Sequence, residues 1–273
     1  ILFFNRLAET TYNTFIDGTG EIISGRVFDK AGKVLNGIPV KAYGANGYIY
    51  TATSNAKGIY PLPKVPSNMT YLLTAPITGA GTALRTVLTK ESKSLTKDTG
   101  NVRDADLIPG NVATPPATVY VDDDYAIGKP NDGHTWGFDA FAVIQDGVNA
   151  VADGGTVHVA AGAYTERVII IKKLTLAGAG SEAGQTLIRG SLTLFAGGAS
   201  AANRAVIKDV RISGAYDGIL ISGTVNYLTL DNVASVDNFG HGLSTMETST
   251  MTDLQLLNCK FNGNGPNPGT WKA

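Results

Sequence analysis

The strongest constraint on the fold of this chain is a repeat in its last third. Three segments, AVIKDVRISG, LTLDNVASVD and LQLLNCKFNG, align with the same four offsets mostly apolar. The equivalent residues Ile207, Leu230 and Leu256 are separated by 23 and then 26 positions. Periods of this length are typical of architectures in which one structural unit stacks on the next.

Each copy has two inward residues two positions apart, then a three-residue step, then two more inward residues. Asp209, Asn232 and Asn258 occupy the step, and these residue types tolerate the left-handed backbone that a sharp bend requires. A repeat period in the low twenties, filled by strands three to five residues long, leaves no room for a helix between the copies. The pattern therefore predicts a parallel β-helix over residues 119–273, in which each coil stacks its inward side chains on the next.

The same alignment makes two further predictions. LTLAGAG, from Leu174, indicates an earlier coil, with Gly178 at the step and Ala179 at the next inward position. Cys259 falls on an inward offset and is predicted to be a small buried hydrophobic residue. As it is the single cysteine of the chain, a disulfide within the chain and a zinc site of several cysteines are both excluded.

One amphipathic helix is predicted ahead of the coils. Its apolar residues are spaced three, three, four and three positions apart, which places them on one helical face: Phe138, Phe141, Ile144, Val148 and Val151. Gly154 and Gly155 are expected to stop this helix. Such a helix would cap the first coil, whose core and strand edge are otherwise exposed.

Residues 21–110 predict a small β-sandwich, because short apolar strands alternate there with turn residues. The expected strands are EIISGRVFD, IPVKAYG, YIYTATS, one around Ile59, TYLLTAP, ALRTVLTKE and a last one near residues 102–107, with turns at residues 30–33 and 55–58. Residues 111–118 form a linker that contains prolines and is therefore extended and semi-rigid. The predicted fold class is all-β: a small sandwich followed by a short parallel β-helix with one N-terminal capping helix.

Both modules resemble known families. GRVFDKAGKVLNGIPVKAY, TATSNAKGIYPLPKVP and TYLLTAP resemble the carboxypeptidase regulatory-like family of transthyretin-like sandwiches, which implies a stalk or spacer role. Residues 119–264 resemble the right-handed parallel β-helices of the pectin-lyase-like superfamily, which includes pectate lyases, pectin methylesterases and many surface proteins. VYVDDDY and FDAFAVIQDGVNAVADGGTVHVAAGAYTERV are similar to the N-terminal cap of large prokaryotic surface proteins of this kind. About five coils are expected to follow the cap.

The resemblance extends to the fold but not to a catalytic set. GAYTE, ending at Glu166, is similar to a structural segment of pectin methylesterases, and Glu166 is interpreted as a solvated turn residue. The motifs Gln-Asp-Thr-Leu, Asp-Phe-Ile-Phe-Gly and Leu-Gly-Arg-Pro-Trp are not found in the sequence. A pectate-lyase site would need clustered aspartates and an arginine, for which the candidates are Asp209, Asp217, Asp231, Asp237, Arg189, Arg204 and Arg211. Asp209 aligns with the step, which favours a role as a turn residue.

An acidic loop follows the first predicted strand of the β-helix. Asp122, Asp123 and Asp124, with Asp132 nearby, are candidate oxygen ligands of calcium. The alternative is a solvated acidic turn, because adjacent carboxylates on a strand point to opposite faces. Calcium is the one cofactor that the sequence suggests.

Other candidate contact residues are scattered along the chain. His134 and Trp136 are candidates for stacking on a sugar, or for packing their loop onto the capping helix. His158 alternates with valines and is expected to face outward from a strand, and no Ser-His-Asp arrangement is indicated for the three histidines. Asn68 begins a glycosylation sequon, Asn-Met-Thr.

Residues 1–20 begin with four apolar side chains. Ile1, Leu2, Phe3, Phe4 and Leu7 are predicted to form a strand that a neighbouring copy of the chain accepts into a sheet. The alternatives are that this segment folds onto its own domain or is the stump of a longer chain. At the other end, the open β-helix implies either a longer natural protein or a covering subunit.

Composition narrows the function classes. A net charge of −1 gives no indication of nucleic-acid binding, and the chain has no run of eighteen apolar residues that would indicate a membrane span. The chain starts at Ile1 with no signal peptide of the usual form, which is interpreted as a processed secreted chain.

Together these observations favour a non-enzymatic structural or adhesive protein of the cell surface, which contacts glycans or copies of itself. A filament subunit that assembles head-to-tail by strand donation is one form of this hypothesis. The alternatives are a polysaccharide-active enzyme and a carbohydrate-binding module.

Overall fold

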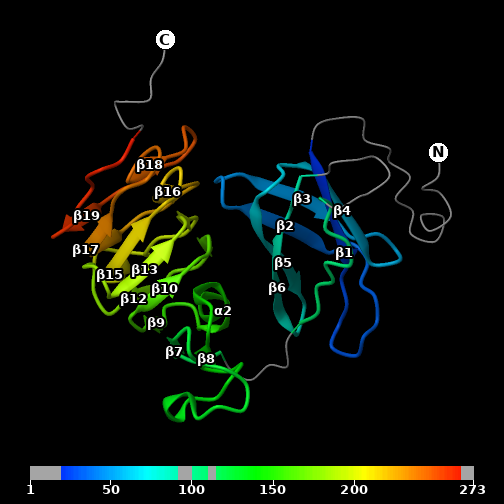
Figure 1. Ribbon diagram of the computed structural model, residues 1–273. Helices are drawn as coiled ribbons and strands as arrows, with labels where there is room; N and C mark the ends of the chain where they lie inside the picture. Colours follow the sequence, from blue (N-terminus) through cyan, green and yellow to red (C-terminus); the bar gives the residue numbers. More distant parts are fainter. Residues whose placement is uncertain (1–19, 92–99, 110–114, 266–273) are drawn as a thin grey trace. The chain divides into compact units, whose positions relative to one another are not determined.

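The computed structural model of the protein describes residues 20–91, 100–109 and 115–265. The main division between its two compact units falls between residues 113 and 114 (Figure 1). The predicted donor strand, with Ile1, Leu2, Phe3, Phe4 and Leu7, lies outside the described residues, as does half of the predicted linker, residues 111–114.

The first unit is a sandwich of two antiparallel sheets. One sheet pairs β1 (Glu21–Arg26) with β4 (Ile59–Val65), and the other has the order β3-β2-β5-β6. The strands of the second sheet are β2 (Pro39–Gly44), β3 (Ile49–Thr53), β5 (Thr70–Ile77) and β6 (Gly81–Leu88). These are the strands predicted from sequence, except that the last one, near residues 102–107, forms only isolated parallel bridges at Val102 and Leu107.

Inward residues of both sheets share one core, as the alternating pattern requires. Ile23 and Leu62 from the first sheet, and Val40 and Leu73 from the second, are fully buried within it. Tyr60 is also fully buried, and its hydroxyl donates a hydrogen bond to the Ala105 carbonyl, so its polar atom is satisfied inside the core.

The two predicted turns of the sandwich are confirmed, and in each a side-chain oxygen replaces a backbone acceptor. Asp29 Oδ1 accepts from the N–H groups of Ala31 and Lys33, both at 2.9 Å. Asn55 Oδ1 accepts from two N–H groups of the next turn, at 2.9 and 3.0 Å. Side chains of this type specify tight turns in this way.

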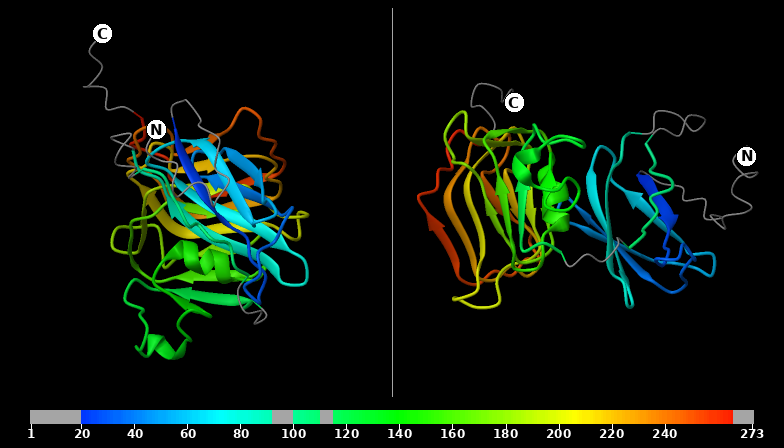
Figure 2. Two further views of the ribbon diagram at one scale, coloured as in Figure 1. Left: turned by 90° about the vertical axis from the view of Figure 1, so that its right-hand side faces the viewer. Right: turned by 90° about the horizontal axis from the view of Figure 1, so that it is seen from below.

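The second unit is a parallel β-solenoid of about six turns. Its strands are β7 (Thr118–Val121), β8 (Ala140–Phe141), β9 (Thr156–Val159), β10 (Gly162–Tyr164), β11 (Val168–Ile170), β12 (Thr175–Ala177), β13 (Thr186–Arg189), β14 (Leu192–Leu194), β15 (Ala205–Ser213), β16 (Ile219–Ile221), β17 (Leu228–Ser235), β18 (Leu243–Thr245) and β19 (Leu254–Leu257). A nine-stranded sheet runs from green β7 to red β19, and β11, β14, β16 and β18 form a second parallel sheet (Figures 1 and 2).

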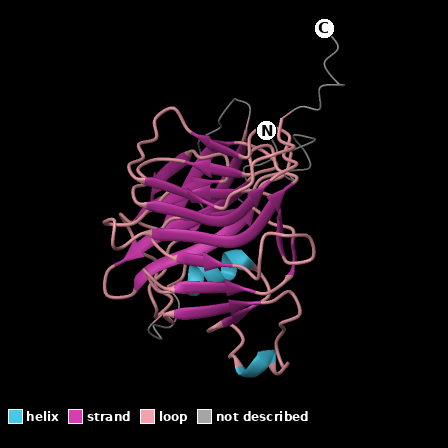
Figure 3. Ribbon diagram, turned by 90° about the vertical axis from the view of Figure 1, so that its left-hand side faces the viewer, coloured by secondary structure: helices cyan, strands magenta, loops and turns pink. Residues whose placement is uncertain are grey.

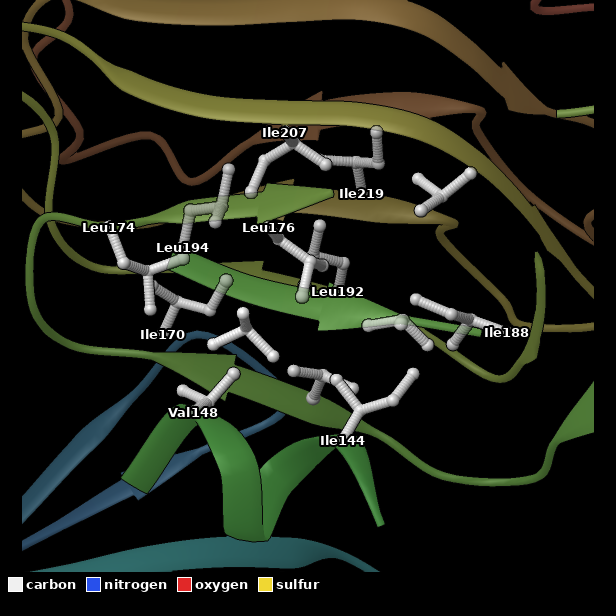
Figure 4. Close-up of a cluster of buried hydrophobic side chains, with 14 of the residues drawn as sticks. Ile144, Val148, Ile170, Leu174, Leu176, Ile188, Leu192, Leu194, Ile207 and Ile219 are labelled. Carbon is white, nitrogen blue, oxygen red and sulfur yellow. The ribbon is translucent and has the colours of Figure 1, made fainter. Parts of the chain in front are cut away.

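The register of the solenoid is the one that the repeat predicts. Ile207 on β15 pairs with Leu230 on β17, which pairs with Leu256 on β19. The first two are buried in the core that the coils share, and inward side chains from successive coils stack there (Figure 4). Each such side chain contributes about 1.5–3 kcal/mol through burial, which is what holds the coils together.

The last described coil is less buried than the coils before it. Leu256 occupies the same inward position as Leu230 but is 46% exposed. Cys259 faces the core, as predicted, but it is only half-buried, and its Sγ lies 3.4 Å from the Leu230 carbonyl oxygen. Partial burial raises the pKa of the Cys259 thiol.

The step of the repeat has the left-handed backbone that was expected. Asp209, Asn232 and Asn258 have φ values of 57°, 51° and 53°. Asn232 Nδ2 also donates to Asp209 Oδ1 at 2.8 Å, so the bend of one coil is hydrogen-bonded to the bend of the next. The step residues therefore both turn the chain and fix the stacking of the coils.

The earlier coil, LTLAGAG, is confirmed in its first half and corrected in its second. Leu176 pairs with Ile207 as the alignment requires. The next inward position, however, is taken by Thr186 instead of Ala179. Residues 180–185 form a loop, and after it the pairing of Leu187 with Arg211 sets the register. Thr186 is fully buried, and its hydroxyl donates to backbone carbonyls of the preceding coil.

The predicted capping helix is present but shorter than expected. Helix α2 spans Ile144–Ala150, and a 3-10 helix, η1, spans Asn131–Gly133. Phe141 lies in β8, where pairing with Val121 makes it part of a strand, and Phe138 lies exposed in the preceding turn. Within the described residues, no helix is long and apolar enough to cross a membrane.

Helix α2 closes the solenoid at its first coils (Figure 3). Ile144 and Val148 point from it into the stacked core (Figure 4). On its other side Gln145 lies against the edge strand β11, where its side-chain amide donates to the Ile169 carbonyl at 3.0 Å and accepts from the Ile169 N–H at 2.6 Å. The side chain of Gln145 thus satisfies the backbone N–H and carbonyl of one residue of the edge strand, as a neighbouring strand would.

Charged side chains that precede and follow β11 in the sequence form hydrogen bonds with the two ends of α2. The Glu166 carboxylate accepts from the N–H groups of Ile144 and Gln145, at 2.8 and 2.9 Å, and burial raises its pKa. Lys172 Nζ donates to the carbonyls of Asn149, at 3.1 Å, and Val151, and burial lowers its pKa to about 8. The interpretation of Glu166 as a solvated turn residue is therefore wrong, because its oxygens satisfy the helix N-terminus.

We expect Glu166→Ala to destabilise the protein by about 1–3 kcal/mol, because two N–H groups at the start of α2 lose their acceptors in a mostly buried place. Urea unfolding measures this change. Glu247→Ala removes an exposed glutamate of the loop after β18 and is the matched control, expected to leave stability unchanged. Equal midpoints for the two variants would contradict the capping role of Glu166.

Candidate functional site

Two consecutive coils carry protruding turns that stack on each other. Residues 214–218 join β15 to β16, and residues 236–242 join β17 to β18. The N–H groups of Phe239 and Gly240 donate to carbonyls of the first turn at 2.8 and 2.6 Å. The backbone hydrogen bonds between successive coils therefore continue through the turns. Residues at equivalent positions of the two turns are neighbours in space.

Two glycines allow the turns to pack this closely. A Cβ atom at Gly218 would lie 2.1 Å from Ser235 Oγ and 2.6 Å from Asn238 Nδ2. A Cβ atom at Gly242 would lie 2.6 Å from Asn264 Nδ2. Only glycine leaves room at these points for the polar side chains beneath the turns.

Two asparagines form the base of the turns. Asn238 is buried, and its Nδ2 donates to Ser235 Oγ at 3.3 Å and to Asn264 Oδ1 at 2.9 Å. Its Oδ1 accepts from the Ala215 N–H at 3.2 Å. Asn264 Nδ2 in turn donates to the Ser235 carbonyl at 2.9 Å. This network connects three successive coils and fixes the position of the residues above it.

An open pocket of about 620 Å³ lies over the stacked turns. Tyr216 and Phe239, at its margin, are 73% and 69% exposed, which is unusual for large aromatic side chains. Phe261, His241 and Asn264 also line it, together with Leu243 and three glycines. Exposed rings beside polar groups in a concave place are the features of a ligand site.

An imidazole and a carboxylate form a pair at this pocket. Asp217 Oδ1 lies 2.9 Å from His241 Nδ1 and also accepts from the His241 backbone N–H at 3.0 Å. With Nδ1–H as the donor, the neutral ring keeps Nε2 as an acceptor for a ligand hydroxyl. The pair has the geometry to orient hydroxyl groups.

Two ion pairs involve cations that are close in sequence to the pocket residues. Arg211 contacts Asp237 at 2.9 Å, and Lys260 contacts Glu182 at 2.5 Å. The ammonium of Lys260 lowers the pKa of the Glu182 carboxyl. Both cations are therefore engaged by carboxylates.

Among the aspartates and arginines considered for a lyase, the structure brings Arg211 and Asp237 into contact. Asp209 lies at the step beside Asn232, as expected, and Asp231 accepts from Asn258 at 3.3 Å. Arg204 contacts Asp253 at 2.9 Å. Asp217 and Asp237 have different partners, His241 and Arg211, and Arg189 is exposed on β13.

The acidic loop does not bring its carboxylates together either. Asp122 Oδ1 accepts from the Asp124 N–H at 3.0 Å, and Asp132 Oδ2 accepts from the Tyr125 hydroxyl at 3.1 Å. Burial, together with that bond, raises the pKa of Tyr125 to about 12. Within the described residues, no three His, Cys, Asp or Glu side chains, Asp123 included, are arranged to hold a metal ion. Calcium binding stays a prediction.

His134 and Trp136 lie at the first coil, apart from the pocket residues in the sequence. The His134 ring stacks on the Tyr120 ring with 3.7 Å between the ring centroids. The His158 ring stacks on the same tyrosine with a centroid distance of 5.4 Å. His158 is exposed, as its alternation with valines predicted. Trp136 is 37% exposed, so a sugar contact at this loop stays a prediction. Asn68, the sequon residue, is exposed in the turn between β4 and β5.

Sequence reasoning missed Tyr216, Phe239 and the pocket between them. The signal that could have revealed them is a second layer of the repeat, because Ala-Tyr-Asp-Gly and Phe-Gly-His-Gly stand at the same offsets before β16 and β18. Residues between strands are not constrained to be apolar, so an alignment of inward positions alone passes over them.

Comparisons with protein-family models, with curated proteins and with solved structures found no match to this chain. The parallel β-solenoid is established by the structure itself. Membership of the two families that the modules resemble is not supported by any relative.

We expect Gly218→Ala to destabilise the protein by about 1–3 kcal/mol, as overpacking does in a close-packed interior. The added methyl group would displace Ser235 or Asn238 and disturb the pocket as well. Gly214→Asn is the matched control in the same turn, since its backbone is left-handed, which asparagine tolerates, and the space around it is open. Thermal unfolding compares the variants, and a larger loss in Gly214→Asn would refute this account of the turn.

Proposed function

We propose that this protein is a non-enzymatic adhesive protein of the cell surface that binds glycans through the pocket over residues 214–218 and 236–242. The observation that supports this most directly is the pair of exposed rings, Tyr216 and Phe239, beside the Asp217–His241 pair. Aromatic faces hold the apolar face of a sugar ring, and polar groups beside them bond its hydroxyls.

The sandwich serves in this proposal as a spacer that carries the solenoid. That role, and the extracellular location, follow from the resemblance of the two modules to carboxypeptidase regulatory-like and pectin-lyase-like proteins. The parallel solenoid agrees with the second resemblance at the level of fold. Fold alone does not give function, so the pocket carries the proposal.

A polysaccharide-active enzyme is the alternative, and the Asp217–His241 pair is the observation that favours it. Glycoside cleavage usually requires two carboxyl groups on either side of the scissile bond. The described residues that line the pocket provide rings, an imidazole and an amide instead. These groups suit binding better than paired proton transfer, so we rank binding first.

We expect Tyr216→Ala and Phe239→Ala each to weaken glycan binding by about tenfold, through the loss of one stacking contact of ~1.4 kcal/mol. A glycan array identifies the ligand, and calorimetry with that ligand measures the loss. Tyr48→Ala removes an exposed aromatic residue of the sandwich and is the control.

The variant Trp136→Ala tests whether glycans bind at this pocket or at the loop of the first coil. Loss of binding in Trp136→Ala alone would place the glycan site at that loop and refute the pocket. Release of reducing ends from a polysaccharide, abolished in Asp217→Asn, would replace binding by catalysis.

Self-assembly by strand donation involves residues 1–8 and stays a prediction. We expect deletion of residues 1–8 to leave a folded monomer that no longer polymerises, because the donor strand supplies both the backbone hydrogen bonds and the apolar side chains. Negative-stain electron microscopy of the intact and shortened chains is the measurement. Unchanged polymers after the deletion would refute strand donation.

A further inference from the structure

We infer that the pocket over the stacked turns selects neutral sugars and rejects uronates, an inference that rests on the glycan binding proposed above. Pectate lyases and pectin methylesterases, which are among the solenoids that this unit resembles, act on pectin, a uronate polymer, so the inference departs from them. It follows from the charges of the described residues around the pocket.

The described residues that line the pocket include neither lysine nor arginine. Its polar side-chain groups are the His241 imidazole, the Asn264 amide and the Tyr216 hydroxyl. A sugar carboxylate is usually bound by a guanidinium or ammonium group, which forms charge-assisted hydrogen bonds with it. Neutral hydroxyls need no such partner, and an imidazole and an amide both bond them well.

A carboxylate lies beside the imidazole that lines the pocket. Asp217 lies directly behind His241, with Oδ1 2.9 Å from Nδ1, and its side chain is mostly buried. A ligand hydroxyl can bond the outer face of the imidazole without penalty. A ligand carboxylate in that place would be repelled by the charge of Asp217 across one ring, and solvent weakens this repulsion because the His241 side chain is 69% exposed.

The cations nearest in sequence to the pocket residues are engaged elsewhere. Arg211 contacts Asp237, and Lys260 contacts Glu182, so each would have to break an ion pair to reach an anionic ligand. Arg189, on the preceding coil, is exposed but does not line the pocket.

Calorimetry on the intact protein tests the selectivity with matched hexasaccharides. The neutral probes are linear hexaoses of glucose, mannose and galactose, and the charged probe is hexagalacturonate. All titrations are carried out in one buffer at one pH and ionic strength, so that the probes differ only in their own charge. We expect at least one neutral hexaose to bind, and hexagalacturonate to bind at least about tenfold more weakly, a difference of about 1.4 kcal/mol.

Asp217→Asn links the selectivity to its cause. The amide oxygen of asparagine still accepts from His241, so the turn keeps its hydrogen bonds. We expect the preference for the neutral hexaose, measured as the ratio of the two dissociation constants, to fall several-fold in the variant, because the like charge is gone.

The outcomes separate the two proposals. Tighter binding of hexagalacturonate than of any neutral hexaose would overturn the inference and leave glycan binding intact. An unchanged preference in Asp217→Asn would also overturn it, since the carboxylate would then not be the cause. Binding of none of the four probes, at concentrations up to the millimolar range, would overturn the proposed glycan binding itself.

Discussion

Hydrogen bonding between successive coils is the interaction on which the rest of the solenoid depends. Because parallel strands lie about 4.8 Å apart, residues at one offset form a row along the axis. Inward rows such as Ile207, Leu230 and Leu256 build the core, and the row of step residues fixes the bend. The same register continues through the turns, where it places Asp217 beside His241 although 24 positions separate them.

A stack of this kind needs an end, and α2 provides one. The helix covers the first coils with Ile144 and Val148, while Gln145 imitates a neighbouring strand for β11. Glu166 and Lys172 then bond its two termini from either side of that strand. The cap is therefore held by polar bonds to specific backbone atoms as well as by apolar packing, and the ladder begins from a defined register.

The repeat predicted the solenoid and its register because inward positions obey a simple apolar rule. Predictions failed where a residue has a partner distant in sequence. Phe141 fitted a helical spacing yet forms a strand, because Val121 pairs with it. Glu166 looked solvated, because its partners lie more than twenty residues earlier. The pocket was missed for the same reason: Tyr216 and Phe239 lie outside the inward apolar positions of the repeat, and they line one pocket only because two turns stack.

Within each coil, the residues that support the turns differ from the residues that the turns expose. Gly218, Gly242 and Asn238 connect the turns to the interior, whereas Tyr216 and Phe239 are mostly in solvent. The first group tolerates little substitution, and the second can change without disturbing any buried contact of the core. Under the glycan-binding proposal, substitutions in these two adjacent loops can therefore change the ligand while the buried framework stays the same.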